Sequence, residues 1–391
     1  MDVREAVLAA IDAESAPLVA LSRDLHAHPE LAFEEHESVR KLLEYLRRHQ
    51  GITIEEGTGG LPTAFRAWVG TATGPAVGIV CEYDALAGLG HGCGHNLIAT
   101  SAVAVLAGLA PQAATLGGRV IVIGSPAEEG KGGKLILAER GAYNGLAAVL
   151  HTHPADRHRL SGPTIGMATL HIAFQGRAAH VGSANDRGIN ALDALLQLFN
   201  AMNAMRQQVR DGCRLYGIIT RGGDALNTIP DQTAAEIGVR AQTEEYLREL
   251  LERVEACARG AATATGCAVS IGRPPLSYYP PMRLNRTLGR LLGDTLRSLG
   301  EPVEDFPPGF EGYANDVGAV SRTTPAALLN YKIGRAGVAE HSVEFRDAAA
   351  SDEGHRGMVL AAKAMALAAL ALLSDAPLRA RVGAEFERGD G

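Results

Sequence analysis

Short, continuously apolar runs alternate with segments of helical periodicity along the first part of the chain. The apolar runs lie in AVGIVCEY, RVIVIGSP and LAAVLHTH (residues 76–83, 119–126 and 146–153). A helical pattern follows the first run after His95, and another follows the second over residues 134–140. Unbroken apolar strands that alternate with helices are typical of a sheet covered on both faces. We therefore predict an α/β domain with a mixed, largely parallel sheet flanked by helices.

The pattern changes between residues 163 and 273. Its predicted order is strand (164–175), helix (189–209), two strands (213–221 and 232–242), helix (244–259) and strand (267–273). This is a βαββαβ, ferredoxin-like unit, inserted into the larger domain. After a proline-rich return, a helix (285–299), a strand (326–331) and an apolar helix (357–373) complete the first domain. We predict a first domain over 1–165 and 277–391, and an inserted domain over 166–276.

Composition narrows the classes of function. The chain has 391 residues, enough for two domains, and a net charge of −7 with interspersed signs. No basic patch for nucleic acid or an anionic membrane is present. Five cysteines are few and odd in number, which argues against a disulfide framework. The acidic start MDVREAVLAAIDAE lacks a signal-peptide core, so we expect a cytoplasmic protein, with helix 357–373 buried in its core.

Polar residues that bind metals gather where the predicted strands end. They are Asp84, Cys93, His95, Glu128, Glu129 and His153. Open α/β sheets place their ligands at the carboxyl ends of strands. Thiolate, imidazole and carboxylate groups together are ligands of divalent transition metals. The flanking Gly92 and Gly94 let the backbone turn tightly, so that Cys93 and His95 can face one point.

Two details of these motifs bear on chemistry. Adjacent Glu128 and Glu129 permit one carboxylate to bind metal while the other moves protons. HTHP offers two histidines, His151 and His153, for one ligand position, and the pattern alone leaves both open. GHGCGHN lacks the third glycine of a dinucleotide loop, and EEGKGGK lacks the Ser or Thr of a phosphate loop.

The order of the motifs resembles the amidohydrolase branch of the aminoacylase and carboxypeptidase family of dinuclear metallopeptidases. This branch includes auxin-conjugate hydrolases, aminobenzoyl-glutamate hydrolase and β-alanyl dipeptidases. The resemblance rests on LHAHPELAFEEHES, CEYDALAGLGHGCGHN, GSPAEEGKGG, GRAAHVG, ALNTIPDQTAAEIGVRAQT and EHSVEF, which run nearly end to end. Asn96 departs from the aspartate common after Cys-Gly-His, a variation similar to the β-alanyl dipeptidase and aminobenzoyl-glutamate side of the branch.

The resemblance implies a role for each matching residue. Its metal ligands are Cys93, His95, Glu129, His153 and His341, with Cys93 bridging two ions and His151 as the alternative to His153. It makes Glu128 the general base and acid, and places Asp84 where a carboxylate orients a ligand. In the inserted lid and dimerisation domain, His180 reaches toward the scissile carbonyl, often across a dimer. Asn227 and Arg240 match positions that hold the substrate's carbonyl or carboxylate.

The expected activity is hydrolysis of an amide bond in a small N-acyl or N-aminoacyl amino acid, with a dipeptidase for short β-alanyl dipeptides as the alternative. Water activated by two divalent ions would attack while Glu128 accepts its proton. Zinc suits the thiolate and imidazoles, and manganese, cobalt or nickel also fit such a site. The rival classes are a non-catalytic metal-dependent binding protein, against which Glu128 argues, and a thiol enzyme using Cys93, which chelation would test.

The expected partners are a small-molecule substrate and a second copy of the chain. An edge strand of the inserted domain, such as residues 169–175 or its neighbour, would pair between subunits to form a homodimer.

Overall fold

The computed structural model describes residues 2–389, and these form two compact units. The first contains the chain up to Pro163, Met282–Glu311 and the chain from Asp316 onward. The second contains Thr164–Pro281 together with the short segment Gly312–Asn315.

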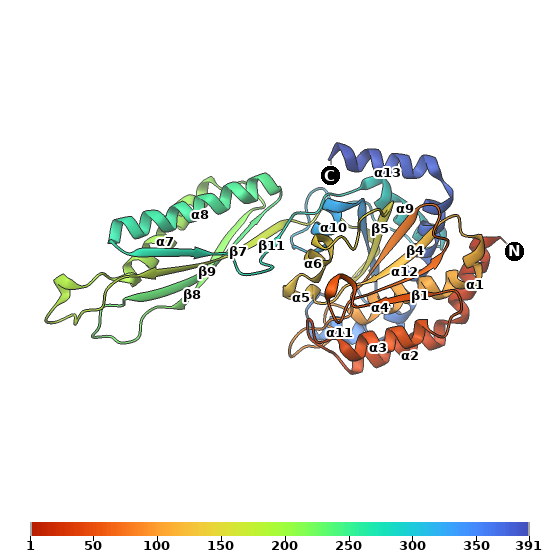
Figure 1. Ribbon diagram of the computed structural model, residues 1–391, viewed down its shortest axis with the longest axis horizontal. Coiled ribbons are helices and arrows are strands. Elements are labelled where there is room, and N and C mark those ends of the chain that lie inside the picture. The colour runs from red at the N-terminus through yellow and green to blue at the C-terminus, as the bar shows by residue number, and fades with distance from the viewer. Residues whose placement is uncertain (1, 390–391) are drawn as a thin grey trace. The chain divides into compact units, whose positions relative to one another are not determined.

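The first unit is built on a mixed seven-stranded sheet, as predicted (Figure 1). Its strands, in spatial order, are β1 (Thr53–Glu56), β2 (Phe65–Gly70), β4 (Arg119–Gly124), β3 (Ala76–Cys81), β5 (Ala148–Ala155), β12 (Ala326–Lys332) and β6 (Arg159–Leu160). The central β4, β3, β5 and β12 are parallel, and the strands outside them are antiparallel. The parallel core brings the carboxyl ends of β3, β4 and β5 to one edge.

Helices cover both faces of this sheet because its central strands are apolar on both sides. Val77 and Ile79 of β3 belong to one apolar cluster, and Val80 belongs to another. The larger cluster takes residues from α1 (Val3–Ala13), α2 (Ser15–Ala27), α3 (His36–Leu46), α4 (His95–Leu109), α9 (Arg286–Ser298), α12 (Asp352–Ser374) and α13 (Ala376–Arg388). The smaller cluster takes residues from α6 (Gly133–Glu139) and α10 (Val317–Thr323).

Two helices of the first unit, α4 with its extension to Thr115 and α12, are long and apolar enough to span a membrane by length and composition. Most of their residues are buried inside the protein, as in core helices. In α4 every side chain from His95 to Leu109 is buried, and α12 packs against it. The predicted apolar helix over 357–373 is therefore confirmed as a core element, and it begins earlier, at Asp352 after the cap Ser351.

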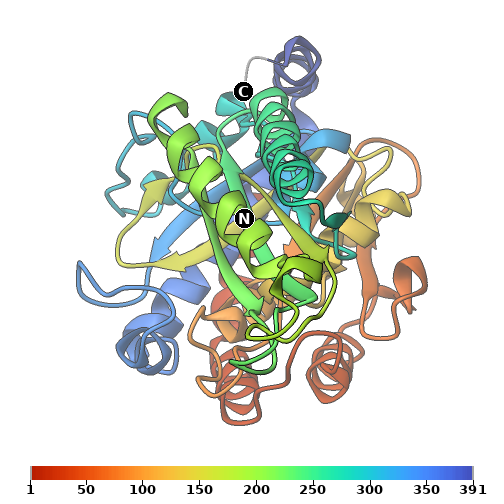
Figure 2. The ribbon, with the colours of Figure 1, turned by 90° about the vertical axis from the view of Figure 1, so that its left-hand side faces the viewer.

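The second unit is the predicted βαββαβ unit, made of β7 (Gly166–Gln175), α7 (Ala191–Met205), β8 (Arg214–Arg221), β9 (Gln232–Ala241), α8 (Glu244–Thr265) and β10 (Ala268–Gly272). The strands run antiparallel in the order β10-β7-β9-β8, and β11 (Tyr278–Tyr279) adds to β7. Helices α7 and α8 lie side by side (Figures 1 and 2). Because β7 lies between β10 and β9, the prediction of residues 169–175 as an edge strand was wrong. The edges of this order are β10, which pairs with β7, and β8, which pairs with β9.

One boundary in this unit differs from prediction. Helix α8 continues past residue 259 to Thr265 and ends at Gly266, whose φ of 73° is left-handed. Ala258, Ala261 and Ala262 are buried in the unit's core, and this packing offsets the cost of Gly260 within the helix.

Candidate metal centre

The metal-binding motifs converge at the carboxyl edge of the first unit's sheet. Cys93 and His95 stand at the start of α4, where Gly94 has a φ of 75°. A Cβ at Gly94 would lie 2.8 Å from the Pro154 side chain, so glycine lets the loop pack against HTHP. His153 is part of β5, and its Nε2 lies 3.4 Å from the Cys93 Sγ.

Two sets of three side chains in this region could each hold an ion. In one set Cys93, His95 and His153 place ligand atoms within 4.8 Å of one another, and in the other Cys93, Glu129 and His341 do the same. Cys93 is common to both. His341 reaches the cluster from the loop before α11 (Val343–Ala348), its Nε2 3.3 Å from the Glu129 Oε1. A third grouping combines His95 with Glu128 and Glu129, so geometry alone permits either glutamate to bind.

Asp84 contacts two of the candidate ligands, His95 and Glu129. Its Oδ1 lies 3.0 Å from the His95 Nδ1, and its Oδ2 accepts the backbone N–H of Glu129 at 2.8 Å. This bond engages one ring nitrogen of His95 and leaves the Nε2 facing the cluster, as metal-binding histidines require. That Nε2 is buried and has no hydrogen-bond partner among residues 2–389. A buried, unpartnered imidazole nitrogen beside a thiol and carboxylates fits a metal ligand.

Glu128 lies beside these donors in the tight segment α5 (Glu128–Lys131). Its Oε2 is 3.8 Å from the His95 Nε2. Burial raises the pKa of the Glu128 carboxyl well above its usual range, and the negative charges of Glu82 and Asp316 add to the effect. A carboxyl group that holds a proton more readily than usual is suited to accept one from water.

The backbone that presents the two glutamates is held in an uncommon conformation. Ala127 has a φ of 60°, which non-glycine residues seldom adopt. Its N–H donates to the buried Glu35 Oε1 at 2.8 Å, and its carbonyl accepts from the Gly133 N–H at 3.1 Å. A Cβ at Gly133 would lie 1.8 Å from the Pro126 oxygen, so only glycine fits there. These contacts close the loop and direct Glu128 and Glu129 to one side.

His151 does not face the thiol cluster. Its Nε2 lies 3.3 Å from the Glu82 Oε2, and both residues are fully buried. Glu82 in turn contacts the buried Lys134, which also binds Asp316. The pattern of the chain did not single out Glu35, Glu82, Lys134 or Asp316. For Glu82 a signal was available, because this charged residue directly follows the apolar strand AVGIVC.

The remaining candidate residues belong to the second unit. His180 and Asn227 are exposed on neighbouring loops, joined by a hydrogen bond from the Val181 N–H to the Asn227 carbonyl at 3.2 Å. Arg240 lies near the other end of β9, where its Nε donates to the Tyr216 hydroxyl at 3.1 Å. Gln232, at the start of β9, is eight residues from Arg240, which corresponds to roughly 27 Å of strand.

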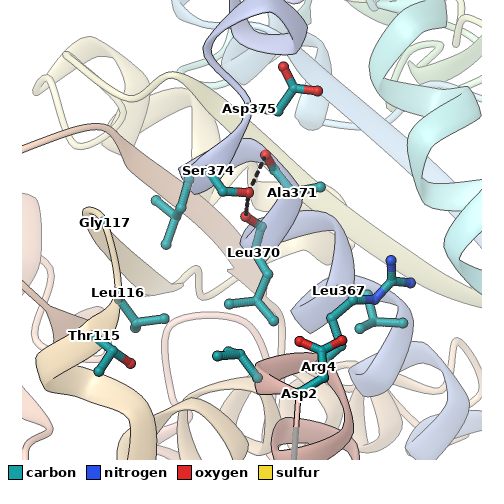
Figure 3. Close-up of a pocket in the computed structure, with 12 residues that line it drawn as sticks. Asp2, Arg4, Thr115, Leu116, Gly117, Leu367, Leu370, Ala371, Ser374 and Asp375 are labelled. Atoms are coloured by element: carbon teal, nitrogen blue, oxygen red, sulfur yellow. Dashed lines mark hydrogen bonds between the residues drawn. The ribbon is translucent and has the colours of Figure 1, made fainter.

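Figure 3 shows a cavity of about 590 Å³ in the first unit, and none of the candidate metal ligands lines it. It is lined by Leu116, Gly117, Leu367, Leu370 and neighbours, near the amino end of β4. The candidate metal ligands lie at the carboxyl ends of the strands, so this cavity is separate from them.

Comparison with known proteins places these features in a family. Residues 164–265 match the family model described as a peptidase dimerisation domain. The chain is 34% identical to the Xaa-Arg dipeptidase of Mus musculus, over 96% of this chain and 90% of that protein. It is 30% identical to one component of the p-aminobenzoyl-glutamate hydrolase of Escherichia coli K12, over 75% of this chain and 64% of that one.

A solved structure supports the same assignment for the fold. A Bacillus subtilis protein described as a dinuclear metal-binding peptidase of the M20 family superposes with a TM-score of 0.70 at 23% identity. The superposition covers 93% of this chain and 99% of that one. This chain therefore belongs to the M20 family of metal-dependent peptidases and amidohydrolases, and it is a hydrolase of amide bonds.

Proposed function

We propose that this chain hydrolyses the amide bond of a small N-aminoacyl or N-acyl amino acid, with dipeptides as its first substrate class. The observation that carries the proposal is the pair of ligand sets sharing Cys93, with Glu128 beside them. Similarity to mouse and human Xaa-Arg dipeptidases over 96% of the chain favours dipeptides with a carboxyl-terminal arginine. Similarity to the p-aminobenzoyl-glutamate hydrolase keeps N-acyl amino acids as the second class.

In this proposal Cys93, His95 and His153 would hold one ion, and Cys93, Glu129 and His341 would hold the other. The choice of His153 over His151 follows from the contact of His151 with Glu82. Two bound divalent ions would acidify water and polarise the substrate carbonyl. Zinc suits the thiolate and imidazole donors, and manganese, cobalt or nickel are also compatible with them.

The protein's own groups do the proton transfer and the orientation. Glu128 accepts the proton of the attacking water and delivers it to the leaving amine, because its carboxyl is buried beside His95. Asp84 fixes the His95 ring and the Glu129 backbone through its two oxygens. His180 steadies the oxyanion, and Asn227 and Arg240 hold the substrate's carbonyl or carboxylate.

We further propose that the active form is a homodimer joined through the second unit. Strand β8 is an edge strand and exposes Tyr216 and Ile218, at 43% and 62%, on one face. An apolar edge strand is a surface on which a second copy can pair. Arg240 and the His180–Asn227 loops lie toward opposite ends of the same sheet, so one chain cannot bring all three to one substrate. A dimer can combine groups from two chains in each site.

The proposal is tested with metal-stripped protein given zinc, manganese or cobalt. Substrates are Xaa-Arg, Xaa-Lys and Xaa-Ala dipeptides, N-acetyl amino acids and aminobenzoyl-glutamate, followed by release of free amine. We expect hydrolysis that requires the added ion, with Xaa-Arg favoured over Xaa-Ala. A protein that binds two ions yet cleaves none of these amides would refute the proposed activity.

A further inference from the structure

A lysine is fully buried behind the catalytic segment. The Lys134 Nζ lies 2.6 Å from the Glu82 Oε1 and 2.6 Å from the Asp316 Oδ1, and none of the three side chains is exposed. The backbone N–H of Lys134 also donates to the Asp316 Oδ2 at 2.9 Å. Buried ion clusters are commonly no more stable than apolar residues of similar volume. Burial of three charges beside a catalytic site therefore indicates a role beyond holding the fold together.

Each member of this cluster belongs to a different part of the site. Glu82 directly follows β3 and precedes Asp84 by two residues. Its Oε2 lies 3.3 Å from the His151 Nε2 and 3.7 Å from the His95 Nε2. Asp316 precedes α10 and directly follows Gly312–Asn315, the segment grouped with the second unit. Lys134 binds both carboxylates. It thereby connects the segment after β3, which contains Glu82 and Asp84, with the helix that begins after Asp316.

Lys134 also lies directly beyond the loop that carries the two glutamates. The Gly133 N–H closes that loop on the Ala127 carbonyl at 3.1 Å, so the next residue is rigidly connected to it. Glu35 and Asp84 hold the loop at one side, through the N–H groups of Ala127 and Glu129. Lys134 is the anchor on the other side. Without its ammonium group, the loop would keep the Glu129–Asp84 bond and the backbone bond of residue 134 to Asp316, and would lose the side-chain link to Glu82 and Asp316.

We propose that Lys134 is a positioning residue for Glu128. Its ammonium group, bound by Glu82 and Asp316, holds the 127–133 loop so that the Glu128 carboxylate stays beside His95 and free of the ions, while Glu129 binds. This rests on the proposed function, in which Glu128 is the general base. Burial lowers the pKa of the Lys134 ammonium, but the negative charges of Asp316 and Glu82 have the larger effect. The pKa therefore lies well above its usual range.

The test compares three variants with the wild-type enzyme on the best substrate found in the screen. Lys134→Met removes the charge at similar length. The triple variant Lys134→Met/Glu82→Gln/Asp316→Asn also removes both carboxylate charges, so that no buried ion is left unpaired. The control is Lys363→Met, because Lys363 also makes a 2.6 Å ion pair, with Asp12, but between α12 and α1.

We expect folded Lys134→Met and the folded triple variant to contain two ions per chain, as measured by elemental analysis. Their KM should stay near the wild-type value. Their kcat should fall about 10- to 100-fold, the usual effect of removing a group that supports an active-site residue. Lys363→Met should leave kcat unchanged. A folded triple variant with wild-type kcat would show that the cluster serves stability alone and would overturn the proposal. Loss of bound metal would overturn it too, by assigning Lys134 to the ion sites. A wild-type enzyme that binds ions but is inactive would instead refute the proposed function.

Discussion

The substitution Glu128→Gln separates the two adjacent glutamates by function. Glutamine has nearly the same shape as glutamate, so the loop can keep its packing and its closing hydrogen bond from Gly133. The change removes only the ability to take a proton. General base catalysis contributes about 10²- to 10⁴-fold, which corresponds to roughly 3–5 kcal/mol of transition-state stabilisation. We therefore expect kcat to fall by about 10²- to 10⁴-fold with little change in KM.

The assay pairs steady-state kinetics with elemental analysis of bound metal. Glu128→Gln should keep both ions, because neither ligand set that shares Cys93 includes Glu128. The matched variant Glu129→Gln should lose metal and activity together. If Glu128→Gln loses metal, the third grouping, of His95 with both glutamates, is the correct one. If it keeps metal and loses less than about tenfold in kcat, Glu128 is not the general base.

Three further predictions follow from the same geometry. His153→Ala should release metal, whereas His151→Ala should retain it, since His151 contacts Glu82 and not Cys93; the reverse result by elemental analysis would exchange their roles. Burial raises the pKa of Glu35 from 4.5 to about 7 in the folded protein, so the contribution of this one carboxyl to stability is fully present below pH 4.5 and declines as the pH rises to about 7. Glu35→Gln should remove up to about 3 kcal/mol of that decline, as measured by urea unfolding at pH 5 and pH 8, and an unchanged pH dependence would contradict it. Ile218→Lys on β8 should convert a dimer to a monomer by light scattering, whereas Lys363→Met should not; a dimer that persists in Ile218→Lys would exclude β8 as the interface.

The fold was largely predictable because its pattern is strong. The central strands are apolar on both faces. Their short length and the absence of a helical hydrophobic period distinguish them in the sequence from the helices around them. The βαββαβ order of the second unit followed from the same alternation. What the pattern did not determine was the position of each strand in the sheet. Sequence order places β7 first in its unit, but only long-range pairing places it between β10 and β9.

The candidate metal ligands that the structure brings together could also be selected from the sequence, because rare residue types occur next to glycines at strand ends. The supporting residues could not. Glu82 directly follows an apolar strand, which was the one local signal, and nothing local distinguishes Lys134 from an exposed lysine. Their burial depends on Asp316, which lies 182 residues beyond Lys134. Contacts of that separation become visible only when the chain is folded.

The most direct measurement for the metal centre is anomalous diffraction from crystals grown with zinc or manganese, recorded at the absorption edge of the ion. The two ligand sets predict two peaks about 3.5–4 Å apart, as in other two-metal sites. The Cys93 Sγ should lie between them, with His95 and His153 on one ion and Glu129 and His341 on the other. A single peak, or two peaks of which one does not contact Cys93, would contradict a thiolate-bridged pair of ions.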